Sequence, residues 1–82
     1  DKISYHPYRA RPESHYQADI RGLRGLIGRF RANVPLWQGE NGAPSFGGGE
    51  GALSNLAWTE ETQAKWLLRR LLMDLHLGIE VS

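Results

Sequence analysis

The residues best suited to chemistry lie where a short apolar run ends in a loop rich in glycine. Val34–Gln38 is typical of a buried strand, and Gly39, Glu40, Asn41 and Gly42 follow it directly. A carboxylate between glycines can be approached closely by a ligand, because little side-chain bulk surrounds it. In parallel α/β folds, catalytic groups lie at the carboxyl ends of strands. Glu40 is therefore the candidate catalytic residue, and Asn41 beside it is a candidate substrate-binding residue.

A second polar group ends the first expected strand, Lys2–Tyr8, in which Pro7 stops the pairing. Neighbouring parallel strands lie about 4.8 Å apart, so side chains at their ends can meet over one site. The Tyr8 hydroxyl could then hydrogen-bond the Glu40 carboxylate, fix its orientation and favour its ionised form. A carboxylate held in this way suits a nucleophile in sugar chemistry, with His6 donating to a sugar hydroxyl.

A helix is expected between these two strands. Ser14 and Gln17 have the spacing of a capping box, in which the side chains at the first and fourth positions satisfy helix-end amides. Apolar residues then recur at three- and four-residue steps, which predicts an amphipathic helix: Ile20, Leu23, Ile27 and Phe30.

A long connection over residues 41–58 leads to a second predicted helix, and loops of this length are often functional. Thr59 is the expected N-cap and Gly78 the expected stop. The helix has a broad apolar face, made of Ala64, Leu67, Leu68, Leu71, Leu72 and Leu75. Residues 78–82 are expected to begin a third strand.

The predicted fold class is α/β, with the order β-α-β-α-β and parallel strands joined by right-handed crossovers. Three such strands with helices on one side leave two unpaired edges and one uncovered face, whereas parallel sheets are normally covered on both. We therefore expect the sheet to be completed by the remainder of a larger barrel or by other copies of the chain.

Two motifs taken together resemble a known family. His6-x-Tyr8, followed one βα unit later by Trp37-x-Gly39-Glu40-x-Gly42, is similar to the late strands of clan A retaining glycoside hydrolases, the family 5-like (β/α)8 barrels. The resemblance implies that residues 1–82 form a C-terminal segment of a TIM barrel catalytic domain, from strand six to the start of strand eight. It also implies Glu40 as the nucleophile, Tyr8 as its hydrogen-bonding partner and His6 as a substrate contact.

The chain departs from this family in one important respect. The general acid/base of the clan lies in an Asn-Glu dipeptide, which this sequence lacks. Retaining hydrolysis requires two carboxyl groups about 5–5.5 Å apart. We expect the parent domain to hydrolyse β-linked carbohydrate and the 82 residues alone to be inactive, with the acid/base supplied from elsewhere.

Composition argues against several other functions. The net charge is +1 despite ten Lys and Arg residues, so a nucleic-acid interface is not expected. No apolar run approaches the roughly 20 residues that span a membrane. There are no cysteines, and the three histidines lie on different predicted elements, so neither a metal site nor a cofactor is expected. The composition indicates no particular cellular compartment.

Two simpler interpretations stand beside the enzymatic one. Glu40 can be an ordinary solvated carboxylate in a loop. The chain can also be a non-catalytic α/β module that assembles with a partner, or with itself, through open sheet edges. A third and weaker alternative is a nucleic-acid binder that uses the arginines of the first helix.

Overall fold

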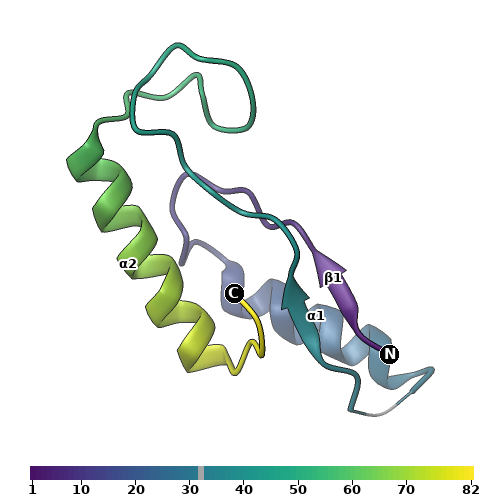
Figure 1. Cartoon of the computed structure of the whole chain (residues 1–82). Helices are drawn as coiled ribbons and strands as arrows, with labels where there is room; N and C mark the ends of the chain where they lie inside the picture. The colour runs from purple at the N-terminus through teal and green to yellow at the C-terminus, as the bar shows by residue number, and fades with distance from the viewer. Residues whose placement is uncertain (32) are drawn as a thin grey trace.

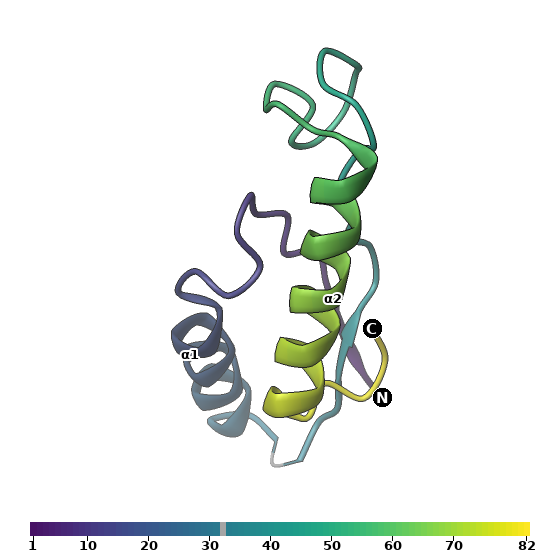
Figure 2. The same cartoon turned by 90° about the vertical axis from the view of Figure 1, so that its left-hand side faces the viewer.

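The computed structural model describes residues 1–31 and 33–82. In chain order its elements are β1 (Ile3–Tyr5), α1 (Tyr16–Gly28), β2 (Leu36–Gln38) and α2 (Glu60–Leu77) (Figure 1). The strands are parallel, and Ile3 pairs with Leu36 and Tyr5 with Gln38. Both helices lie on the same side of this sheet (Figure 2). The apolar core between helices and sheet is centred on Tyr16, Ile20, Leu36 and Ile79.

The prediction of a (β/α)8 barrel fragment with the order β-α-β-α-β is wrong. The described residues form two helices and a two-stranded sheet of three-residue strands. The expected third strand makes only an isolated bridge, between Val81 and Trp37. Two hydrogen bonds hold it to β2: Gln38 N donates to Val81 O at 2.9 Å, and Glu80 N to Leu36 O at 3.3 Å. So short a sheet has neither the strand number nor the strand length of a barrel wall.

Helix α1 begins differently from the prediction. Its N-cap is His15, in the left-handed region with φ 57°, and no side chain caps the helix end. The chain enters through a tight turn in which Ser14 N donates to Arg11 O and Tyr16 N donates to Glu13 O. Ser14 therefore lies before the helix, and its expected capping box does not form.

Helix α2 has the limits that its sequence predicts. Thr59 Oγ1 accepts from Thr62 N at 3.2 Å, while Thr59 N donates to Thr62 Oγ1 at 2.8 Å. This reciprocal arrangement is a capping box with threonine at both positions. At the other end, Gly78 takes up the left-handed conformation (φ 62°) that lets a glycine terminate a helix.

The two sides of α2 are used in an unexpected way. The buried side carries Trp66, Arg70 and Asp74, of which two are charged. The leucines at 67, 68, 71, 72 and 75 are all exposed. The helix thus turns a partly polar side to the sheet and its apolar side to the outside.

The connection over residues 41–58 has neither helix nor strand, and it extends beyond the start of α2 (Figure 1). Trp58 helps to hold it. Its Nε1 donates to Leu53 O at 2.7 Å, and its ring forms a T-shaped pair with the ring of Trp66, with 6.5 Å between the centroids. Gln63 Nε2 donates to Ala43 O at 2.6 Å.

Neither helix in the described ranges combines the length and apolar character needed to cross a membrane.

Candidate functional site

The carboxyl ends of the two strands bring three of the predicted residues together. Gly39 N donates to Tyr5 O at 3.0 Å, which carries the parallel pairing one step beyond β2. Directly after that bond, Glu40 leaves the sheet beside the end of β1. There the chain turns tightly around Pro7, with Tyr8 N donating to His6 O at 3.1 Å.

The two oxygens of the Glu40 carboxylate have different surroundings. Oε1 accepts a hydrogen bond from the Tyr8 hydroxyl. Oε2 faces His6 Nδ1 at 4.0 Å, too far for a hydrogen bond but close enough for an ion pair when the imidazole is charged. The side chains are open to solvent, with 65% of Glu40 and 54% of His6 exposed. One oxygen is thus held by a phenol, and the other is left at the surface beside an imidazole.

Gly39 has a steric reason to be glycine. A Cβ at this position would collide with the Ser4 hydroxyl and would come within 2.8 Å of His6 Nε2. Real Cβ contacts are longer than this, so a side chain at residue 39 would push His6 away from the strand end. The missing side chain therefore allows the imidazole to lie against β2, next to Glu40.

The Tyr8–Glu40 contact also affects the protonation of the phenol. The hydrogen bond to Glu40 raises the pKa of Tyr8 above its ordinary value of 10.0, with smaller contributions from desolvation and from the negative charge of the carboxylate. Tyr8 consequently stays protonated through the neutral range and remains a hydrogen-bond donor to Glu40.

Asn41, the fourth predicted site residue, points elsewhere. Its Nδ2 donates to Gln38 Oε1 at 3.2 Å, and its Oδ1 is enclosed without a hydrogen-bond partner among the described residues. Beside it lies an open hollow of about 340 Å³ between the start of the long loop and α2. Its lining is formed by Asn41, Gly42, Ala43, Gln63, Ala64, Trp66 and Leu67. Asn41 therefore borders a different space from the one that Glu40 faces.

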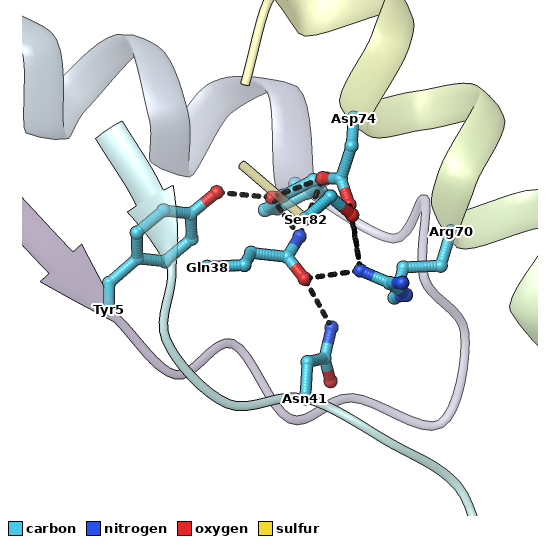
Figure 3. Close-up of polar contacts among 7 residues, drawn as sticks. Tyr5, Gln38, Asn41, Arg70, Asp74 and Ser82 are labelled. Atoms are coloured by element: carbon cyan, nitrogen blue, oxygen red, sulfur yellow. Dashed lines mark hydrogen bonds and ion pairs between the residues drawn. The ribbon is translucent and has the colours of Figure 1, made fainter. Parts of the chain in front are cut away.

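Sequence reasoning missed a network of buried polar side chains between the sheet and α2 (Figure 3). Asp74, only 1% exposed, is at its centre. Its Oδ1 accepts from Tyr16 OH at 2.7 Å and from Gln38 Nε2 at 2.6 Å. Its Oδ2 accepts from Ser82 Oγ at 2.6 Å and from Arg70 Nη1 at 3.1 Å. A buried carboxylate with four donors is well compensated for its loss of water.

This network joins β2 to α1, to α2 and to Ser82. Arg70 Nη1 also donates to Gln38 Oε1 at 2.7 Å, so the amide of Gln38 bridges both members of the ion pair. The Tyr5 and Tyr16 hydroxyls are 2.5 Å apart, which extends the network to β1. Two sequence signals could have found it: Gln38 ends a buried apolar strand, and Arg70 and Asp74 are four residues apart on one helix face.

Burial has a clear electrostatic effect on this network. It raises the pKa of Tyr16 far above the ordinary value of 10.0, and the hydrogen bonds to Tyr5 and Asp74 act in the same direction. Burial likewise raises the pKa of Tyr5. Both phenols therefore remain donors, and the network is a structural element that holds β2, and with it the segment leading to Glu40, against α2.

The side of the sheet away from the helices carries a small polar cluster. Trp37 Nε1 donates to Glu80 Oε2 at 2.6 Å, and Lys2 Nζ lies 3.6 Å from the Trp37 ring centroid and 3.6 Å from the same carboxylate oxygen. The Trp37 hydrogen bond lowers the pKa of Glu80, and Lys2 adds to that effect. This cluster leaves Glu80 engaged rather than available as a second carboxyl group for Glu40.

Within residues 1–31 and 33–82, no three His, Asp or Glu side chains are grouped so that they could hold a metal ion. The side chains that meet at the strand ends are a carboxylate, a phenol and an imidazole. Comparison with protein-family models, with curated proteins and with solved structures finds no match to the chain.

Proposed function

We propose that the chain carries the nucleophile half of a retaining glycoside hydrolase site, in which Glu40 forms a covalent glycosyl intermediate. The observation that supports this is the unequal environment of the two Glu40 oxygens. Tyr8 holds Oε1, while Oε2 is free at the surface. A carboxylate fixed through one oxygen presents the other in a defined direction, as attack on an anomeric carbon requires.

The proposed reaction has two steps. Glu40 Oε2 forms a bond to the anomeric carbon as the glycosidic C–O bond breaks, and the leaving oxygen takes a proton from a general acid outside these 82 residues. Water then attacks the same carbon, gives a proton to the conjugate base of that acid, and releases Glu40. Tyr8 keeps the carboxylate oriented throughout, and His6 contacts a sugar hydroxyl.

The absence of a general acid from the chain dictates the design of the test. A 2-deoxy-2-fluoroglycosyl fluoride has a leaving group that needs little protonation, so a nucleophile can be labelled without the acid/base. Intact mass measurement after incubation with gluco- and manno-configured reagents should show the addition of one fluoroglycosyl unit. Peptide mapping should locate it at Glu40.

Matched variants make the labelling specific. Glu40→Gln should abolish the mass increase, and Glu50→Gln, in the exposed long loop, should leave it unchanged. Labelling that persists in Glu40→Gln, or that maps to another carboxyl group, would exclude Glu40 as the nucleophile. If neither reagent labels the unsubstituted chain, the proposal is contradicted.

A further inference from the structure

Helix α2 carries a strip of leucines that no other part of the described chain covers. The five residues retain between 43% and 78% of their surface: Leu67, Leu68, Leu71, Leu72 and Leu75. At 100° per residue they occupy an arc of about 140°, in which Leu67 adjoins the buried side that carries Trp66, Arg70 and Asp74 and the other four lie farther round the helix. A strip of this kind on the outside of a small protein marks an interaction surface.

The central seam of this strip has a symmetric spacing. Ala64, Leu68, Leu71 and Leu75 are separated by four, three and four residues. This is the alternation of the a and d positions in a coiled coil, where apolar residues recur every 3.5 residues on average. Because four-three-four reads the same in both directions, an antiparallel copy of the helix presents a matching seam.

We infer that the leucine strip of α2 is the interface of a homodimer in which two α2 helices pack antiparallel. In this arrangement Ala64 of one copy lies opposite Leu75 of the other, and Leu68 lies opposite Leu71. Leu67 and Leu72 flank the seam on its two sides and widen the contact. The small Ala64 leaves room for the facing Leu75, so the ends of the seam pack without overcrowding.

The dipole of α2 favours a second copy in this orientation. Antiparallel packing places the positive N-terminal end of each helix beside the negative C-terminal end of its neighbour. The contact is isologous, since the same surface is used twice, and it therefore closes at two copies.

The size of the surface predicts the strength of the dimer. An 18-residue helix is about 27 Å long, and packed helices lie about 8–10 Å apart. Two such helices in contact along their length bury a total area near the lower end of specific interfaces, about 1,000–1,200 Å². The dimer should therefore be weak, and its population should depend on concentration.

Sedimentation equilibrium over about 5–500 µM of the whole chain tests the association. The unsubstituted chain should shift from monomer to dimer across this concentration range. Leu68→Gln/Leu75→Gln should raise the dissociation constant at least about tenfold. The matched control is Leu26→Gln/Phe30→Gln, which removes two other exposed apolar side chains, 53% and 84% exposed, one in the last turn of α1 and one just after the helix. It should leave the dimer unchanged, and circular dichroism should show native helix content in both variants.

Disulfide trapping tests the orientation, and the chain contains no cysteine of its own. A mixture of Ala64→Cys and Leu75→Cys chains should form a mixed disulfide on mild oxidation, because these positions face each other across the seam. Neither variant alone should cross-link, since like positions lie about 16 Å apart along the antiparallel helices.

Three results would overturn the inference. One is a parent chain that is monomeric up to about 500 µM. The second is efficient cross-linking of either cysteine variant with itself, which indicates parallel helices. The third is a dimer that survives Leu68→Gln/Leu75→Gln but is lost in Ser4→Pro, which places the contact at the open edge of β1.

Discussion

Two tyrosine–carboxylate pairs in this molecule have the same chemistry and opposite surroundings. Tyr8 donates to Glu40 at the end of the strands, and Tyr16 donates to Asp74 between the sheet and α2. Glu40 has a largely exposed side chain, whereas Asp74 is almost wholly enclosed. The same hydrogen bond therefore orients an exposed carboxylate in one place and joins the sheet to α2 in the other.

The number of donors around each carboxylate explains this difference. Asp74 accepts from four side chains, so its two oxygens are occupied by the protein itself. Among the described residues, Tyr8 is the one hydrogen-bond donor to Glu40, which leaves its second oxygen open to a ligand. Burial with complete pairing contributes stability, while exposure with incomplete pairing leaves a group available for chemistry.

The largest effect should come from removing the buried carboxylate. Asp74→Ala leaves Arg70 buried without its ionic partner and removes the acceptor of three further donors. We expect the free energy of unfolding to fall by about 3–5 kcal/mol, measured by urea denaturation. Glu40→Ala, in the exposed pair, should change it by less than about 0.5 kcal/mol. Equal losses in the two variants would contradict the distinction between the pairs.

The next effect should come from the buried phenol. Tyr16→Phe removes a hydroxyl that contacts Tyr5, Gln38 and Asp74, and leaves them with fewer partners in a buried space. The free energy of unfolding should fall by about 1–3 kcal/mol. Urea denaturation measures this fall in the free energy of unfolding. If the value for Tyr16→Phe equals that of the unsubstituted chain within error, water replaces the hydroxyl at no cost in stability.

The buried pair should also make the free energy of unfolding depend on pH in the alkaline range. Burial raises the pKa of Tyr16 above its unfolded value of 10.0, so the folded state keeps a proton that the unfolded state releases. The stabilisation is fully present below pH 10 and declines as the pH rises further, by at most about 1.4 kcal/mol per pH unit for this group. Urea denaturation from about pH 8 to about pH 11 measures the slope. Tyr16→Phe should reduce this slope, with a remainder from Tyr5 and Tyr8, whose pKa values are raised by burial and by the hydrogen bond to Glu40, respectively.

The smallest change in stability should come from the exposed phenol. Tyr8→Phe should alter the free energy of unfolding by less than about 0.5 kcal/mol, because the side chains of Tyr8 and Glu40 are both exposed to water. It should nevertheless slow fluoroglycosyl labelling of Glu40 by about tenfold to a hundredfold, since the carboxylate loses its orientation. The rate of mass increase measures this, and unaltered labelling would remove Tyr8 from the site.

The pairing of Tyr8 with Glu40 could be predicted from the chain because it depends on local features. Each residue follows a short strand, and parallel strands separated by one helix bring their carboxyl ends to the same edge. The limits of α2 were predictable for the same reason, because Thr59 and Gly78 act within a single helical turn. By contrast, Ser14 failed as a cap because the turn from Arg11 to Ser14 moved the helix start.

The sequence by itself determined the limits of α2 and which carboxylate follows a strand, since these depend on neighbours a few residues apart. Only the tertiary structure decided which side of α2 faces the sheet. Periodicity identifies an apolar face but not what covers it, and the buried side is chosen by contacts such as Gln38 with Asp74, 36 residues apart in the chain. The extent of the sheet was decided in the same way, because Val81 meets β2 at a single bridge that no local pattern encodes.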